Sequence, residues 1–156
     1  MSLEKVKEHL KKFNMENRII TVTESSATVV LAAQSLGCEE ARIAKTLSFT
    51  LKDKNILIVT AGDTKIDNAK YKQEFGEKAH MIPGDLVEKI VGHPVGGVCP
   101  FGVNENIEIY LDESLKRFIT VFPACGSIDT AIELTIEELE TTTNYVKWIN
   151  VCKLKD

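Results

Sequence analysis

The segment that most limits the fold is a run of eleven residues, Gly92 to Gly102, which holds four glycines and two prolines. Glycine weakens helices and strands, and proline fixes φ and lacks a backbone N–H, so this run is predicted to be an irregular loop. Bare glycine backbone can approach a ligand closely and present N–H groups to it, as an oxyanion site requires. The run has neither a P-loop ending nor the glycine spacing of a dinucleotide-binding turn. An ordinary surface loop and a ligand wall both fit this composition.

Before this loop, the chain alternates between helical and strand patterns. Apolar residues at three- and four-residue steps predict an amphipathic surface helix at the start of the chain, and β-branched runs predict strands. The predicted elements are a helix over 3–13, a strand over 18–23, a helix from a Ser25 or Ser26 cap to Leu36, a hairpin of strands 43–51 and 56–61, a helix capped by Asp67 and ending at Phe75, and a helix over 84–91.

After the loop, strand patterns dominate, with predicted strands over 107–111, 117–122, 128–134 and 145–152. Thr135, followed three residues later by Glu138, indicates a capping box at the start of one short helix. Interleaved helices and strands followed by a run of strands favour an α+β fold, a mixed β-sheet with helices packed outside it. A length of 156 residues is usual for one domain, so a single domain over 1–156 is expected.

The charge balance argues against a protein that wraps nucleic acid. The formal net charge is −4, and no basic run extends beyond Lys11-Lys12. Because cations that neutralise phosphates supply affinity for nucleic-acid backbone, no DNA partner is expected, and contact with RNA is expected to be confined to one end and to depend little on salt. The apolar runs fall far short of the roughly 20 residues that span a membrane. A soluble, cytoplasmic protein without a membrane partner is therefore expected.

The four cysteines lie far apart, with no Cys-x-x-Cys pair and no histidine at zinc-finger spacing. They are interpreted as free thiols in a reducing compartment, and neither a metal nor a cofactor is expected. Cys38 and Cys152 fit small buried apolar positions, whereas Cys99 and Cys125 lie in glycine-containing loops. Among the three histidines, only His93 lies inside the glycine loop, and it is a site candidate.

Lys45 lies within an otherwise apolar predicted strand, where a lysine is costly unless it reaches solvent or a partner. It is either an outward-facing residue of the alternating strand or part of a site, and both interpretations stay open. The cluster from Ala124 to Ser127 joins two predicted strands and fits a hairpin loop. No catalytic triad and no His-Glu-x-x-His metal motif can be assembled.

Four motifs follow one another across most of the chain: AKTLSF around Lys45, GHPVGGVCPFG, LDESL from Leu111, and PACGS from Pro123. Together they resemble the YbaK/EbsC family, the prolyl-tRNA-synthetase-associated editing domains. The resemblance implies hydrolysis of mischarged aminoacyl-tRNA. An aminoacyl ester is already activated, so a positioned water and oxyanion donors could suffice without a triad. The implied partners are the acceptor end of mischarged tRNA and a prolyl-tRNA synthetase.

The resemblance also implies site residues. Lys45 matches the family's required strand lysine, and residues 96–100 match its Gly-x-x-x-Pro substrate loop. A second loop at 126–127 is implied to line the same pocket, which requires the three segments to converge. The implied catalytic residues are Lys45, Gly96 and Gly97. The implied substrate-binding residues are Thr46, His93, Val98, Cys99, Pro100, Gly126 and Ser127.

The expected substrate is tRNA for proline that carries alanine or cysteine, although the motifs do not fix which amino acid is removed. Two other classes stay open. One is a synthetase-associated module that binds an aminoacyl or nucleotide-like ligand without turnover. The other is a hydrolase of a different small ester or amide. Turnover of mischarged tRNA separates the first from an editing enzyme, and dependence on the terminal adenosine separates the second.

Overall fold

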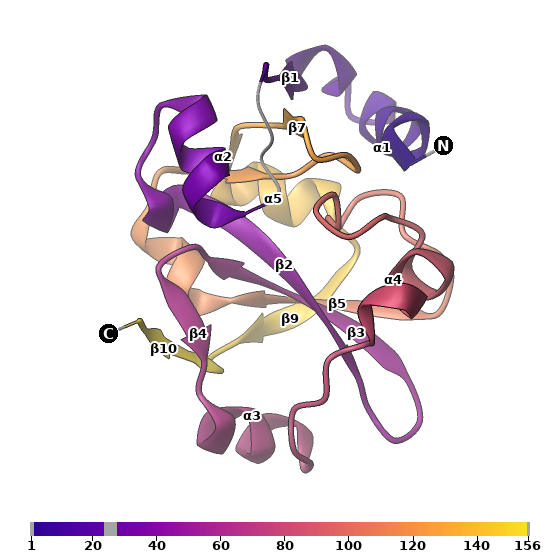
Figure 1. Ribbon diagram of the computed structural model, residues 1–156, viewed down its shortest axis with the longest axis vertical. Helices are drawn as coiled ribbons and strands as arrows, with labels where there is room; N and C mark the ends of the chain where they lie inside the picture. The colour runs from indigo at the N-terminus through magenta and orange to yellow at the C-terminus, as the bar shows by residue number, and fades with distance from the viewer. Residues whose placement is uncertain (1, 24–27, 156) are drawn as a thin grey trace.

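The computed structural model describes residues 2–23 and 28–155, and its sheet is mixed and central. Figure 1 shows the helices α1 (Ser2–Lys11), α2 (Val29–Leu36), α3 (Asn68–Phe75), α4 (Gly84–Val91) and α5 (Ile136–Thr142) outside this sheet. The strands are β1 (Ile20–Thr21), β2 (Ile43–Thr50), β3 (Asn55–Ala61), β4 (Thr64–Ile66), β5 (Ile107–Asp112), β6 (Thr120–Pro123), β7 (Thr130–Ala131), β8 (Leu134–Thr135), β9 (Tyr145–Ile149) and β10 (Cys152–Leu154).

Six strands form the main sheet in the order β8-β6-β2-β3-β5-β9, and β1-β7 and β10-β4 form two-stranded ribbons. The predicted hairpin is the antiparallel pair β2 and β3, whereas β3 pairs with β5, and β5 with β9, in parallel. The expected α+β fold with a mixed sheet and outer helices is confirmed. No helix in the described parts of the chain is long and apolar enough to cross a membrane.

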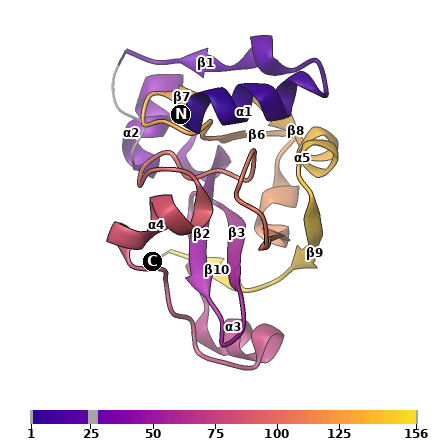
Figure 2. The same cartoon turned by 90° about the vertical axis from the view of Figure 1, so that its right-hand side faces the viewer.

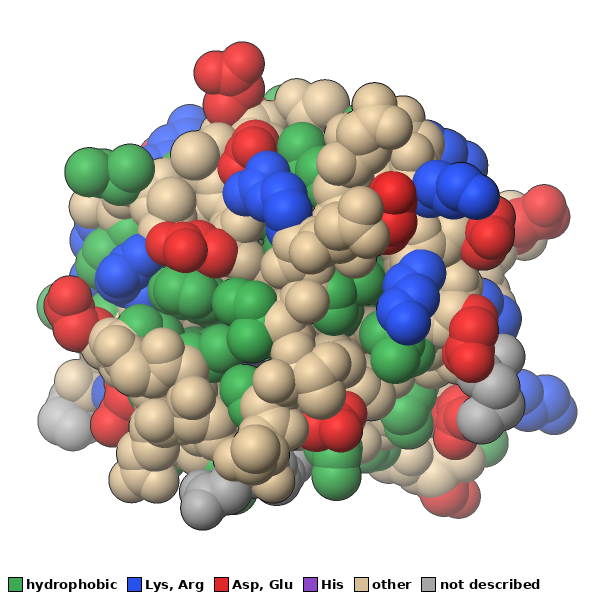
Figure 3. Space-filling model, turned by 90° about the horizontal axis from the view of Figure 1, so that it is seen from above, with side chains coloured by type: hydrophobic (Ala, Val, Ile, Leu, Met, Phe, Trp, Pro, Cys, Tyr) green, Lys and Arg blue, Asp and Glu red, His purple; other side chains and the backbone are tan. Residues whose placement is uncertain are grey.

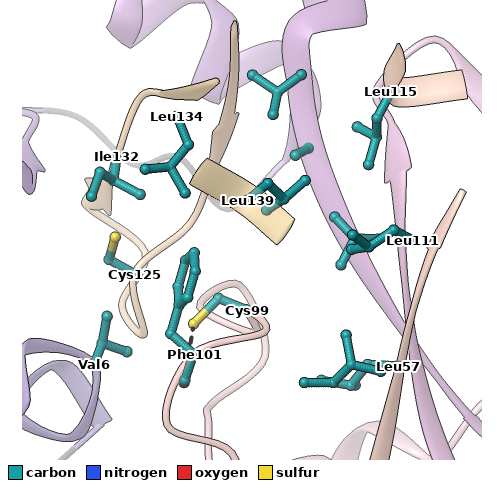
Figure 4. Packing of buried hydrophobic residues seen from close by; sticks show 14 of the residues in the cluster. Val6, Leu57, Cys99, Phe101, Leu111, Leu115, Cys125, Ile132, Leu134 and Leu139 are labelled. Atoms are coloured by element: carbon teal, nitrogen blue, oxygen red, sulfur yellow. Dashed lines mark hydrogen bonds between the residues drawn. The ribbon is translucent and has the colours of Figure 1, made fainter. Parts of the chain in front are cut away.

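The central strand β3 is buried on both faces because its apolar residues run without alternation. On one face, Ile56 and Ile58 pack with Tyr71 of α3. On the other face, Leu57 and Val59 pack toward α1, α5 and the glycine loop. Figures 1 and 2 place α1 and α3 at opposite ends of the molecule. The larger cluster joins the sheet to the loops, as Figure 4 shows.

The helix signals read from the sequence are confirmed where they are local. Asp67 accepts hydrogen bonds from the N–H groups of Ala69 and Lys70, and Thr135 and Glu138 form the capping box. α2 differs, because its cap is Thr28, whose hydroxyl accepts from the N–H of Leu31. The predicted cap at Ser25 or Ser26 falls on positions outside the described residues.

Four predicted strands are shorter or split, because non-local contacts end them. The strand expected over 18–23 is only β1. The strand expected over 117–122 begins at Thr120, since residues 113–117 form a 3-10 helix capped by Asp112. The strand over 128–134 divides into β7, which pairs with β1, and β8, which pairs with β6. The strand over 145–152 breaks where the N–H of Val151 donates to Asp112 Oδ1, and β10 then pairs with β4.

Candidate functional site

A cavity of about 640 Å³ opens beside β2. Its walls come from α2, residues 43–48 of β2, residues 81–84, α4, the glycine loop, and the adjoining parts of β6 and β7. Most of its lining is aliphatic, including Ala32 and Leu36 from α2 and Ile82 and Val87 on the opposite side. An apolar hollow with a few polar groups at its wall is the usual form of a small-ligand site.

The polar part of this wall is the edge of β2. β6 pairs with β2 only at Ile43 and Ala44. Further along the strand, the carbonyl of Ser48 accepts from the N–H of Ile82, at 3.1 Å. Among the described residues, no strand pairs with this edge between those points. The edge therefore faces the cavity with backbone groups that no strand of the described chain pairs.

Thr46 lies in the middle of this open edge. The N–H of Thr50 donates to His80 O at 2.8 Å. Ser48 and Thr50 therefore direct their backbone groups away from β3. Alternation gives Thr46 the same direction. Its hydroxyl oxygen is buried and has no hydrogen-bond partner among the described residues. Thr46 thus offers three polar groups to a ligand.

Lys45 also lines the cavity, but its side chain leaves β2 on the face opposite to that of Thr46. Its ammonium group donates to the carbonyl of Thr64 on β4. Burial lowers the pKa of Lys45, and the nearby positive charge of Lys155 lowers it further. The structure therefore places this lysine half-buried at the cavity wall and not on the outer surface.

The glycine loop contributes Gly96 and Val98 to the cavity. The N–H of Gly97 donates to Pro94 O at 2.9 Å, which closes a turn with Gly96 at φ +90°. Only glycine adopts this φ readily at the third position of such a turn. Because the N–H of Gly97 is already bonded within the loop, it is not free for a ligand, contrary to its expected role as an oxyanion donor.

Gly97 instead joins the two loops that the sequence motifs single out. A Cβ on Gly97 would lie 2.6 Å from both the Gly126 carbonyl carbon and the Ser127 amide nitrogen. The Ser127 hydroxyl is bonded to Asp129 Oδ1 at 2.8 Å and to Thr130 Oγ1 at 2.6 Å. The two loops therefore meet, as expected, but Gly97, Gly126 and Ser127 lie behind the cavity lining.

His93 is fully buried and does not line the cavity. Its Nε2 donates to the carbonyl of Phe101 at 2.6 Å, so its Nδ1 accepts from the hydroxyl of Ser2 at 2.5 Å in the neutral ring. Burial lowers the pKa of His93. In place of the expected substrate contact, His93 makes two hydrogen bonds that connect the glycine loop to the start of α1.

Cys99 and Pro100 are likewise buried outside the cavity lining. Figure 4 shows the thiols of Cys99 and Cys125 packed near Val6 and Phe101. Burial raises the pKa of the Cys99 thiol to about 12, and burial also raises that of Cys125 far above its ordinary value. Neither thiol is a nucleophile in this arrangement.

Of the expected site residues, the cavity therefore collects Lys45, Thr46, Gly96 and Val98, and the others support the loops behind it. Sequence reasoning missed the wall from α2, namely Ala32 and Leu36. Their apolar spacing is the same as that of a helix packed on a core. No signal in one sequence distinguishes these two cases.

Comparison with known proteins decides the family. Residues 23–142 match the family described as "Aminoacyl-tRNA editing domain". The chain belongs to this family. The uncharacterized protein YwhH of Bacillus subtilis (strain 168) is 53% identical over 154 residues, which are 98% of each chain.

Relatives with a described activity are more distant. EbsC of Enterococcus faecalis, a candidate Cys-tRNA(Pro)/Cys-tRNA(Cys) deacylase, is 29% identical over 125 residues, 78% of this chain and 76% of EbsC. A solved structure of a candidate trans-editing enzyme for prolyl-tRNA synthetase matches with a TM-score of 0.87, 25% identity and 97% of each chain covered. The proline–tRNA ligase of Limosilactobacillus fermentum is 30% identical over 69% of this chain but only 19% of the ligase. The YbaK/EbsC resemblance is therefore confirmed.

Proposed function

We propose that this protein hydrolyses the aminoacyl ester at the 3′ end of mischarged tRNA, acting in trans in the cytoplasm on tRNA for proline that carries alanine or cysteine. The observation that carries the proposal is the apolar cavity beside the open edge of β2, where the Thr46 hydroxyl is buried without a partner among the described residues. Membership of the editing family supports the reaction class. The description of EbsC supports the choice of cysteine as one substrate amino acid.

The aminoacyl group lies along the edge of β2 in this proposal. Its ammonium group donates to the carbonyl and hydroxyl oxygens of Thr46, and its side chain occupies the aliphatic part of the cavity. A buried hydroxyl without a partner costs about 1–3 kcal/mol, and a bound ammonium group would recover this energy. The cavity would thus select a small, mainly apolar amino acid that carries a free amino group.

The ester itself is attacked by water. We assign the oxyanion donors to the N–H groups of Gly96 and Val98, which line the cavity, in place of Gly97. Water adds to the carbonyl carbon, the C–O bond to the ribose breaks, and a proton from the water passes to the ribose oxygen. The free amino acid leaves with one oxygen from water. Donors already fixed in a loop need no reorganisation as the negative charge develops.

Lys45 completes the proposed site. Its ammonium group has three N–H donors and uses one of them for the carbonyl of Thr64. The other donors can hold the phosphate of the terminal nucleotide, which would position the ester beside Thr46. This role requires no proton transfer by the lysine.

The test is a deacylation screen against tRNAs for proline charged with alanine, cysteine and proline, together with cysteine and alanine tRNAs correctly charged. Release of alanine or cysteine from tRNA for proline, with proline retained, is the expected result. Tight binding of mischarged tRNA without release would instead establish a non-catalytic module. Equal hydrolysis of a simple alanine ester that lacks adenosine would establish a general esterase.

A further inference from the structure

The ribbon of β4 and β10 brings together lysines that are far apart in the sequence. Lys153 and Lys65 are partners in the antiparallel register. The N–H of Lys155 donates to Asp63 O at 2.9 Å and so continues the ladder beyond β10. Residues opposite each other share a face, as do residues two apart on one strand. Lys65, Lys153 and Lys155 therefore form one row, named here the lysine row.

The lysine row leads to the cavity. Lys45 lines the cavity, and its ammonium group donates to the carbonyl of Thr64, which immediately precedes Lys65. Lys155 lies close enough to Lys45 for the two charges to interact. Positive groups therefore extend from the outer strand β10 to Lys45, a residue that lines the proposed site.

Two aspartates near the lysine row already have partners of their own. Asp63 is paired with Arg117, at 2.6 Å. Asp67 accepts from the backbone of α3 and interacts with Lys153 and Lys70. Lys70 itself donates to the carbonyl of Cys152 on β10. Lys153 and Lys155 are exposed at the end of β10, so both side chains can reach an anion in solution.

Another face of the molecule has a different charge pattern. On the described part of the face seen in Figure 3, Lys and Arg side chains alternate with Asp and Glu side chains around an apolar area. Such alternation gives little net attraction for a polyanion. The lysine row, in contrast, places lysines opposite and next to one another on one face of a ribbon.

We propose that the lysine row binds the phosphates of the acceptor strand of an RNA whose 3′ end lies in the cavity. The inference rests on the proposed function and adds the surface that holds the RNA. Two residues of a strand span roughly 6.6 Å, comparable with one nucleotide step along an RNA strand, so Lys153 and Lys155 can contact neighbouring phosphates. Phosphate contacts of this kind position a nucleic acid without reading its sequence.

This surface revises the expectation of little salt dependence. That expectation came from the absence of long basic runs, but the row is assembled by strand pairing between distant segments. Each phosphate contact contributes about 0.7–0.9 to the slope of log affinity against log salt. The wild type should therefore lose affinity for RNA visibly as salt rises.

The test compares Lys153→Gln/Lys155→Gln with Lys7→Gln/Lys11→Gln, a control that removes two exposed lysines from α1 at another part of the molecule. The probe is an uncharged acceptor-stem minihelix of tRNA for proline, titrated at several salt concentrations. The row variant should lower the salt slope by roughly 1.5 and weaken low-salt binding at least about tenfold. The control should match the wild type, and the row variant should keep the wild-type Tm because Lys153 and Lys155 are exposed.

Activity provides a second readout. With an alanylated minihelix, the row variant should raise KM, whereas hydrolysis of alanyl-adenosine, which has no backbone phosphates, should stay unchanged. An unaltered salt slope in the row variant overturns the proposal, as does an equal loss in the control or an affinity too weak to measure in the wild type. If the slope falls as expected but the wild type releases no amino acid, the lysine row stands and the proposed hydrolysis fails.

Discussion

The backbone of Gly97 lies directly against that of Gly126, so that a Cβ on Gly97 would come within 2.6 Å of the Gly126 carbonyl carbon. Gly97→Ala must therefore separate the two loops behind the cavity, and we expect it to lower both Tm and deacylation. Gly96→Ala should cost about 1–2 kcal/mol in stability because of its positive φ. It should also slow deacylation by about 10²–10³-fold by displacing an oxyanion donor.

Gly37→Ala is the matched control for these glycine variants. Gly37 has φ +68°, and a Cβ there would meet nothing within 4 Å. It should share the backbone strain of Gly96→Ala and keep full deacylation. Thermal unfolding and initial rates measure both effects, and full activity in the Gly96 and Gly97 variants would remove the loop from the mechanism.

Thr46→Val should lower deacylation without lowering stability, because it removes a buried hydroxyl that has no partner among the described residues. Thr60→Val is the control. The Thr60 hydroxyl is also buried without a partner, but Thr60 lies on β3 and outside the cavity lining. Both variants should unfold at or above the wild-type Tm, and only the Thr46 variant should be slow. Equal rates for the two variants would exclude Thr46 from substrate binding.

Lys45→Ala should abolish deacylation and leave Tm nearly unchanged, because the cost of burying an ammonium group offsets its bond to the carbonyl of Thr64. Lys45→Met, which keeps the aliphatic part of the side chain, should be equally inactive. A folded Lys45→Ala protein with normal turnover would refute the site assignment. A large fall in Tm would indicate that the lysine is structural.

Cys99→Ser and Cys125→Ser should retain most deacylation, since no thiol acts as a nucleophile in the proposed reaction. In the native wild type, iodoacetamide should react first with Cys38, because Cys99, Cys125 and Cys152 are buried. Mass spectrometry of tryptic peptides gives the order of labelling. A covalent thioester at Cys99 during turnover would overturn the water mechanism.

His93 should make stability depend on pH in mildly acidic solution. Burial lowers the pKa of His93 in the folded protein, whereas the unfolded chain has a pKa of about 6.5, so the unfolded state binds more protons below that pH. The contribution of neutral His93 to the free energy of unfolding is therefore fully present above about pH 6.5. It is lost as pH falls through the pKa of His93 in the folded protein. Between pH 7.5 and 5, Tm should fall less in His93→Gln than in the wild type. The exposed-site control His80→Gln should keep the wild-type fall, and identical curves for all three proteins would contradict this assignment.

The sequence predicted those features that depend on neighbouring residues. The cap at Asp67 and the capping box of Thr135 with Glu138 involve groups within three residues of one another, so their patterns are visible directly. The splitting of the final strand could not be predicted in this way. It depends on the carboxylate of Asp112, which accepts from the N–H of Val151 across the fold.

The site shows the same division. The motifs that resemble the editing family pointed to Lys45 and to the glycine loop, and both line the cavity. They could not show that the N–H of Gly97 is bonded to Pro94 or that His93 is held by Ser2 and Phe101. The cavity itself arises because β6 stops pairing with β2 after Ala44. The spacing of apolar residues in the sequence does not show where two distant strands stop pairing.

That early departure of β6 also limits the length of what can pair with β2. From Ala44 to Ser48 the strand advances only about 13 Å at roughly 3.3 Å per residue. An exposed strand edge normally invites another chain to add a strand and begin aggregation. Here the walls of the cavity stop such growth at both ends. Among the described residues, this edge leaves room for only about four residue steps of extended chain, so a long strand cannot add to it.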